Sequence, residues 1–202
     1  MSISKTLQED KSTKTKQILI NSASELFVKF GVNKVTIDDI CNNCGLTKGS
    51  FYHYFPSKNY IVAFSINSGL DRYLEENYVL DKNLSVIDQF VALNLCTFDY
   101  FCGIGKELTG LSFVSMLNTY TDVHVEGRHY VNILNSILNR AKNESLITNM
   151  NNEEAYHHCS SIITGILMEW CISTDRLNDM IDWKKLIKIK SKSLNSSNFN
   201  IL

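Results

Sequence analysis

The segment from Thr47 to Lys58 gathers hydrogen-bond donors of several kinds and contains no acidic residue. Its central run is Phe51-Tyr52-His53-Tyr54-Phe55. Successive residues of a helix point about 100° apart, so if Phe51 and Phe55 face inward, the three residues between them must largely face outward. Exposed tyrosine hydroxyls beside Lys48 and Lys58 suit phosphate oxygens. Contact with nucleic acid therefore explains the run better than an aromatic core strip does.

A helix, a tight turn and a second helix are expected to position this segment. Thr36-Ile37-Asp38-Asp39 resembles a capping box, so the first helix should begin at Thr36. Gly45 permits the turn, and Thr47 can cap a second helix over residues 48–54. That helix should end before Phe55-Pro56, because a residue that precedes proline disfavours the α region. This layout is a helix-turn-helix, whose second helix enters the major groove of DNA.

The two helices have apolar residues for mutual packing and one costly glycine. Four residues can hold the helices together: Ile40, Cys41, Leu46 and Phe51. Gly49 lies in the first turn of the second helix, where glycine weakens a helix. Without a side chain, however, Gly49 lets the backbone approach a partner closely.

At these residues the sequence resembles a known family. The segment TIDDICNNCGLTKGSFYHYFPSKNYIV is similar to the DNA-binding head of the TetR family of transcriptional repressors. The shared features are a threonine at the helix start, the turn glycine followed by an apolar residue, the Thr-Lys-Gly-Ser-Phe-Tyr run and a lysine in the next helix. Cys41 and Cys44 depart from the family pattern, in which small residues such as alanine are usual. The resemblance covers about residues 13–65.

The resemblance implies an all-α homodimer with about nine helices per chain. Residues 1–57 would form the helix-turn-helix domain, with a recognition helix at about 48–54, and residues 58–202 the ligand-binding and dimerisation domain. By family position, phosphate contacts fall to Thr36, Tyr52, Tyr54 and Lys58. Base reading falls to Lys48, with Gly49, Ser50 and His53 beside it. The partners implied are a palindromic double-stranded DNA operator, a small-molecule effector and a second copy of the chain.

The remainder of the chain also shows helical periodicity. Leu19, Ala23, Leu26, Phe27 and Phe30 form one apolar stripe, which Gly31 should terminate. Ser57 should cap a helix that continues to about residue 80. Five further helices are expected over residues 85–102, 105–118, 121–147, 153–175 and 180–194. No segment alternates with a period of two, so an all-α fold is predicted.

Ligand and dimer contacts are expected in this second part. An aromatic cavity with polar anchors is predicted from Asn94, Phe98, Phe101, Met116, Tyr120, His124, Arg128 and Trp170, and would suit a small hydrophobic or aromatic effector. The helix expected over residues 153–175 has large apolar residues on one side and mainly small residues on the other. The large residues are Ile162, Ile163, Ile166 and Trp170. The predicted dimer contacts are Ser161, Thr164, Gly165, Met168, Trp183, Leu186 and Ile187.

Composition and charge narrow the function classes. The 202 residues are 44% hydrophobic and 20% charged, with a net charge of −1. Residues 1–60 carry eight Lys/Arg and five Asp/Glu, which gives +3, and the rest carries −4. A basic amino-terminal part, to which Lys11, Lys14 and Lys16 contribute, suits a phosphate-binding end. No uncharged stretch reaches the roughly 20 apolar residues of a membrane span, and the amino-terminal MSISKTLQED lacks the apolar core of a signal peptide. A cytoplasmic protein is therefore expected.

Three alternatives to a ligand-responsive repressor are an enzyme, a cysteine-based sensor, and an activator or co-regulator. The sequence does not distinguish the last of these from a repressor. The sequence has no phosphate loop, dinucleotide glycine motif or HExxH, so neither an enzyme nor a cofactor is expected. Six cysteines in a chain without an export signal should be reduced thiols. The alternative function is a cysteine-based redox or metal sensor on the same scaffold, through Cys41 and Cys44 or Cys96 and Cys102. Cys41-x-x-Cys44 has no second ligand pair at a zinc-finger spacing, so no metal site is expected.

Overall fold

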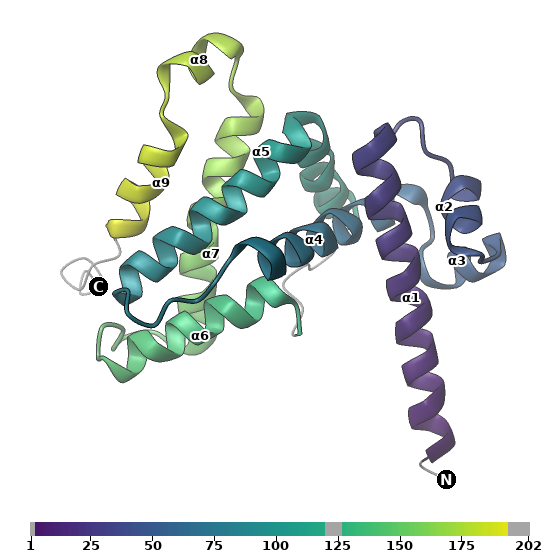
Figure 1. Ribbon diagram of the computed structural model, residues 1–202, viewed down its shortest axis with the longest axis horizontal. Helices are drawn as coiled ribbons and strands as arrows, with labels where there is room; N and C mark the ends of the chain where they lie inside the picture. Colours follow the sequence, from purple (N-terminus) through teal and green to yellow (C-terminus); the bar gives the residue numbers. More distant parts are fainter. Residues whose placement is uncertain (1–2, 120–126, 194–202) are drawn as a thin grey trace. The chain divides into compact units, whose positions relative to one another are not determined.

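The structure, a computed structural model, describes residues 3–119 and 127–193, and in these residues it contains nine α-helices and no strand (Figure 1). The helices are α1 (Ile3–Phe30), α2 (Ile37–Cys44), α3 (Lys48–Tyr54), α4 (Lys58–Asn77), α5 (Val86–Thr119), α6 (His129–Asn143), α7 (Asn152–Ile172), α8 (Asp175–Met180) and α9 (Trp183–Lys192). The predicted all-α class is confirmed. None of the described helices combines the length and apolar character that crossing a membrane requires.

The helix boundaries differ most from the predictions at two places. The expected break near residue 105 is a kink inside α5, where Gly105 has φ 85° and ψ 164°. Residues 175–178, expected as a break, begin the short helix α8, which has no buried residue. Apolar periodicity could not reveal α8 for that reason, and backbone bonds such as Asn178 N to Thr174 O close it locally. The expected helix over 121–147 is α6 in its described part, and residues 121–126 lie outside the described residues.

The chain divides into two compact units. Unit 1 comprises residues 1–69 and 110–123, and unit 2 comprises residues 70–109 and 124–202. The divisions fall inside α4 and α5. Unit 1 is thus larger than the helix-turn-helix domain predicted over residues 1–57, because it also contains the first half of α4 and the end of α5.

Unit 1 is built on the apolar stripe of α1. Leu19, Ala23 and Phe27 have no exposed surface and pack in the core of this unit. Phe30 was predicted to belong to the stripe but is 49% exposed, because the helix ends there and Gly31 turns the chain with φ 82°. The Gly31 N–H donates to Phe27 O at 2.9 Å, which confirms the predicted helix stop.

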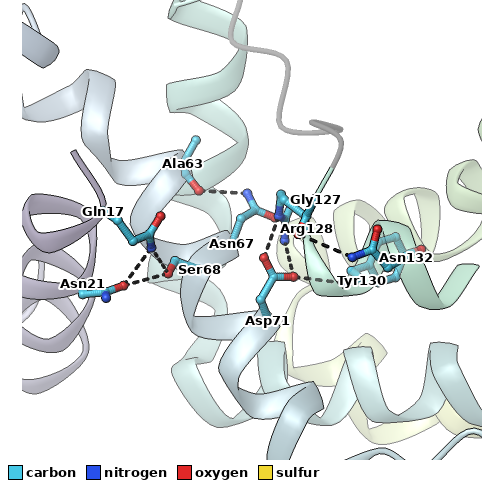
Figure 2. Close-up of polar contacts among 10 residues, drawn as sticks. All are labelled: Gln17, Asn21, Ala63, Asn67, Ser68, Asp71, Gly127, Arg128, Tyr130 and Asn132. Atoms are coloured by element: carbon cyan, nitrogen blue, oxygen red, sulfur yellow. Dashed lines mark hydrogen bonds and ion pairs between the residues drawn. The ribbon is translucent and has the colours of Figure 1, made fainter. Parts of the chain in front are cut away.

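A polar network ties α1 to α4 within unit 1 (Figure 2). Gln17 Nε2 donates to Asn21 Oδ1 at 3.0 Å and to Ser68 Oγ at 3.1 Å. The Ser68 hydroxyl in turn donates to Asn21 Oδ1 at 3.0 Å. On the same side of the unit, Lys16 Nζ lies 4.9 Å from the centroid of the Phe64 ring. Lys16, expected as a source of long-range attraction for phosphate, therefore also contacts the aromatic core.

Unit 2 buries the apolar faces of α5, α6, α7 and α9. Side chains with at most 2% exposure come from each of these helices: Leu93, Leu134, Ile137, Ile166 and Ile187. The predicted core side of α7 is buried at Ile163, Ile166 and Trp170. Phe98 on α5 contacts Trp170 with their ring centroids 5.7 Å apart, so α5 and α7 share this core.

An ion pair joins α4 to the start of α6 within unit 2 (Figure 2). Asp71 accepts from Arg128 Nε at 2.9 Å, from Arg128 Nη2 at 3.1 Å and from the Tyr130 N–H at 3.1 Å. The two side chains are only 16% and 18% exposed. A bidentate pair with a further backbone donor fixes one geometry, so Asp71 sets the position of the amino-terminal end of α6.

Replacing Asp71 with alanine should destabilise the protein. The Asp71→Ala variant leaves the Arg128 guanidinium and the Tyr130 N–H without their acceptor, so we expect a loss of about 1–3 kcal/mol in the free energy of unfolding, measured with urea. Lys190→Ala is the control, since Lys190 and Glu169 are exposed and 3.7 Å apart, and should cost at most about 0.5 kcal/mol. Equal losses in the two variants would contradict this role of Asp71.

Candidate nucleic-acid interface

The helix-turn-helix has the predicted local structure. Thr36 caps α2 in a capping box: its hydroxyl accepts from Asp39 N at 3.1 Å, and Asp39 accepts from Thr36 N at 2.8 Å. Gly45 ends α2 in the left-handed region with φ 69°. Thr47 then caps α3 by accepting from Ser50 N at 3.1 Å. The predicted bounds of residues 48–54 match α3, because the caps and Pro56 are purely local signals.

The two faces of α3 differ as the spacing predicted. Phe51 and Phe55 are fully buried, with ring centroids 5.7 Å apart. Tyr52 is 55% exposed, His53 is exposed and Tyr54 is half-buried. The polar groups of the helix thus lie on the outer side of a firmly anchored element and can reach a ligand outside the chain.

Lys48 has an acidic partner that sequence reasoning missed. Its Nζ lies 2.8 Å from Asp38 Oδ2, and both side chains are 56% exposed. The hydrogen bond to Asp38 raises the pKa of Lys48, so the amine is held protonated beside α2. No local signal in the sequence could reveal this contact, since it depends on how α2 and α3 pack. Any contact of Lys48 with a base must compete with Asp38.

Lys58 does not face outward as the phosphate assignment required. Its Nζ donates to Val32 O at 2.8 Å and to Val35 O at 2.9 Å. The lysine therefore anchors the start of α4 to the loop between α1 and α2, and two of its three donor positions are occupied. The sequence signal for Lys58 was its position after the helix-turn-helix, but that position also brings its amine within reach of the carbonyls of Val32 and Val35.

Thr36 is likewise occupied within the chain. Its hydroxyl donates to Asp39 Oδ2 at 2.7 Å in addition to capping α2. This hydrogen bond and the one from the Thr36 backbone lower the pKa of Asp39. A phosphate at Thr36 would have to displace a carboxylate from both, so we assign Thr36 to helix capping instead of phosphate binding.

Gly49 is not required by the packing of unit 1. A Cβ atom built on Gly49 would meet only Thr47 Oγ1, at the ordinary contact distance of 3.6 Å. Its backbone has no positive φ. Glycine costs the helix about 1 kcal/mol at this position, and no contact within unit 1 requires it. This favours a partner outside the chain that approaches the backbone closely.

The predicted ligand residues lie in several settings. Asn94, Phe98, Phe101 and Trp170 are buried in unit 2, and Arg128 is paired with Asp71. Met116 belongs to unit 1, and Tyr120 and His124 lie outside the described residues. Two hollows within the described part of unit 2 have linings that include none of the predicted residues. One of about 280 Å³ lies between α6 and α7, and the other is a small apolar pocket of about 30 Å³ beside α5.

The predicted dimer residues divide between surface and core. Ser161, Gly165 and Met168 are exposed on α7, Thr164 is half-buried, and Leu186 is half-buried on α9. Trp183 and Ile187 are only 9% and 0% exposed in the single chain. These two residues are corrected to core residues of unit 2, because α9 turns its apolar face onto α7 instead of outward. The exposed face of α9 carries Ile189 in their place, at 57% exposure.

The cysteines of α2 are part of its packing. Cys41 is 3% exposed, and Cys44 Sγ donates to Ile40 O at 3.1 Å. Burial, followed by the nearby Cys44, raises the pKa of Cys41, which disfavours its reactive thiolate form. His157 and His158 are exposed on α7, and His157 contacts Glu153 at 3.0 Å. In the part of the chain that the structure describes, no cluster of three metal-ligating side chains occurs.

Comparison with known proteins decides the family. Residues 19–63, which hold the capped helix-turn-helix described above, match the family of bacterial regulatory proteins called the tetR family. The helix-turn-helix head of the chain therefore belongs to the TetR family, and the resemblance inferred from residues 36–62 is confirmed. A head of this family makes the chain a helix-turn-helix transcriptional regulator.

Individual relatives agree with this membership. The TetC protein of transposon Tn10 from Escherichia coli is 24% identical over 181 residues, which cover 88% of each chain. The transcriptional repressor KstR2 of Mycolicibacterium smegmatis is 29% identical over 85 residues, and the match covers 40% of each chain. The regulator UidR of E. coli K12 is 30% identical over 60 residues, which cover 30% of this chain and 31% of UidR.

Solved structures share the fold. The fatty acid degradation regulator FadR of Bacillus halodurans has a TM-score of 0.50 and 16% identity, with 89% of this chain and 94% of FadR covered. A protein of unknown function from Rhodococcus sp. RHA1 has a TM-score of 0.53 and 14% identity, with 89% and 93% covered. These likenesses support the TetR-like arrangement of helices.

The role of Lys58 can be tested by stability. Lys58→Met should lower the free energy of unfolding by about 1–3 kcal/mol, because Val32 O and Val35 O lose a charged donor. Lys34→Met, which replaces an exposed lysine of the same loop, should change it by at most about 0.5 kcal/mol. Urea unfolding measures both. If Lys58→Met left stability unchanged and weakened only DNA binding, the anchoring role of Lys58 in this TetR-family head would be wrong.

Proposed function

We propose that this TetR-family regulator is a cytoplasmic, ligand-responsive repressor that binds a palindromic operator as a homodimer and is released by a small hydrophobic or aromatic effector. The observation that carries the proposal is the outward face of α3, where Lys48, Tyr52 and His53 are exposed while Phe51 is buried. The relative KstR2 is described as a transcriptional repressor, which supports repression over activation for this regulator.

The proposed DNA contacts follow from the exposed groups of α3. The hydroxyls of Tyr52 and Tyr54 donate to phosphates, which set the orientation of the head. Lys48 leaves Asp38 and donates to guanine O6 or N7, with Ser50 and His53 beside it. Gly49 permits the backbone to come close to the duplex. Thr36 and Lys58 are left out, because their polar groups already have partners within the head.

An exposed stripe on α7 supports the proposed dimer. Ser161, Gly165, Met168 and Ile172 follow one another at spacings of four, three and four residues, and therefore lie on one face. Met168 is 43% exposed and Ile172 is 78% exposed. A second copy would bury this stripe, and small residues allow two helices to approach closely. The dimer would present its recognition helices about 34–36 Å apart, one turn of DNA.

Release by the effector is proposed as a population shift. An effector that binds unit 2 must prefer a conformer in which the two recognition helices no longer fit successive major grooves. A coupling of about 1–3 kcal/mol between the effector and DNA is enough for a clear response. α4 is the proposed mechanical link, because the boundary between the units falls within it.

Alanine at position 49 should separate stability from DNA binding. Gly49→Ala should raise the free energy of unfolding by up to about 1 kcal/mol through helix propensity. A methyl group in a tight contact costs about 1–3 kcal/mol, so the affinity for an operator selected from random duplexes should fall roughly 5- to 150-fold. Fluorescence anisotropy measures the affinity. Gly103→Ala is the control, since Gly103 also has space for a Cβ atom but lies in unit 2, and its DNA affinity should not change.

Removing the partner of Lys48 should strengthen DNA binding. Asp38→Asn frees the amine and removes one negative charge from the α2–α3 surface, so we expect roughly 2- to 10-fold tighter binding at low salt and a steeper salt dependence. The control is Asp179→Asn, which removes an exposed charge from α8 in unit 2. Identical affinities and salt slopes for the two variants would argue against α3 as the DNA-binding surface.

A further inference from the structure

Three polar atoms in the interior of unit 2 have no hydrogen-bond partner. Among the described side chains these are Asn94 Oδ1, Thr97 Oγ1 and the Tyr130 hydroxyl. The three residues are 0%, 2% and 5% exposed. Asn94 Nδ2 donates to Ser191 Oγ at 3.1 Å, which fixes the amide and leaves its oxygen as the unused end. Buried polar groups are nearly always paired, so three unpaired ones in one unit require an explanation.

Helical spacing relates these atoms to the small apolar pocket of unit 2. Phe90, a wall of the pocket, precedes Asn94 by one turn on the same face of α5, and Thr97 follows within the next turn. On α6, Tyr130 lies about two turns before Ile137, which also lines the pocket, on the same face. The pocket and the unpaired atoms thus lie on the same inward faces of two helices.

The pocket itself is uniformly apolar. Its volume is about 30 Å³, and its lining includes Val86, Phe90, Ile137, Leu138, Ile147 and Cys159. Cys159 on α7 also connects it to the polar atoms: burial most of all, followed by the neighbouring Tyr156 and Cys159, raises the pKa of Tyr130. The Tyr130 hydroxyl therefore stays protonated and can donate as well as accept.

We propose that this pocket and the three unpaired atoms bind the effector, and that the effector is an uncharged, mainly aliphatic molecule with at least one hydrogen-bond donor. The proposal rests on the proposed function and narrows its effector class. An amide oxygen only accepts, so Asn94 demands a donor from the ligand, while the two hydroxyls can adapt. The nearby guanidinium of Arg128 is already neutralised by Asp71, so a buried carboxylate would lack a partner.

The small volume of the pocket determines how a ligand can enter it. About 30 Å³ holds a single water molecule, so an aliphatic ligand must push the walls apart as it enters. Binding is then coupled to a rearrangement of α5, α6 and α7. A ligand that binds a rearranged conformer better than the closed one supplies the differential affinity that a population shift needs.

A matched pair of probes tests the ligand class on the full-length protein. 1-Octanol and 1-methoxyheptane have the same heavy atoms, but only the alcohol donates a hydrogen bond. We expect 1-octanol to bind at least about 5-fold more tightly, as one additional hydrogen bond to a buried acceptor implies. Octanoate should bind more weakly than either. Titration followed by calorimetry gives the affinities, and equal affinity for the two neutral probes would overturn the proposal.

Two substitutions that remove a single hydroxyl locate the site. Thr97→Val and Tyr130→Phe should each weaken the binding of both 1-octanol and 1-methoxyheptane by about 2- to 5-fold, because each hydroxyl can donate to the oxygen of either probe. Neither should lower the melting temperature of the free protein, because each removes a buried group that has no partner. Tyr78→Phe is the control: its hydroxyl donates to Gln89 O at 3.2 Å, so this variant should lower the melting temperature and keep the affinity for both probes.

The remaining outcomes separate this inference from the proposed function. If Thr97→Val and Tyr130→Phe destabilised the free protein and left the affinity for both probes intact, the atoms would be bonded to internal water and the inference would fall. Binding of selected operator DNA by the unliganded protein is measured in parallel. Operator binding without probe preference would overturn the effector class alone, whereas probe preference without operator binding would overturn the repressor and leave the ligand site standing.

Discussion

The burial of Phe51 and Phe55 is the constraint on which the DNA-binding head depends. A helix of seven residues is far too short to be stable alone, because nucleation costs more than so few hydrogen bonds return. Two fully buried rings, one turn apart, hold α3 against unit 1. Once these rings face inward, helical geometry leaves Tyr52 and His53 outside. The same two contacts that stabilise the helix therefore also determine which groups it presents.

Local signals in the sequence predicted this part of the fold well. Threonine at an N-cap, glycine after a helix and proline after α3 act over four residues or fewer, so Thr36, Gly45 and Pro56 can be interpreted without a structure. The side-chain partners could not be predicted in the same way. Lys58 meets carbonyls 23 and 26 residues away, and only the packing of α1, α2 and α4 brings them together.

The second unit shows where periodicity fails to assign a role. The pattern of α9 correctly identified an apolar face at Trp183 and Ile187, but a pattern cannot say whether that face meets its own chain or another copy. The same limit applies to the predicted pocket. Phe98 and Trp170 are aromatic and buried, but in this structure their rings contact each other, and burial alone does not distinguish a core residue from a ligand residue. Unpaired polar atoms are more informative, because burial without a partner has a definite cost.

The free-energy cost of an unpaired buried group is similar to the coupling free energy that an effector-controlled regulator requires. Leaving a buried donor or acceptor unpaired is unfavourable by about 1–3 kcal/mol, and the coupling between an effector and DNA in a regulator is typically of the same order. Asn94, Thr97 and Tyr130 thus make the closed interior of unit 2 less stable than a fully paired core would be. A molecule that satisfies even one of them gains free energy only in the conformer that admits it. In this way, unpaired polar groups in the core allow an effector to shift the protein toward the conformer in which these groups are paired.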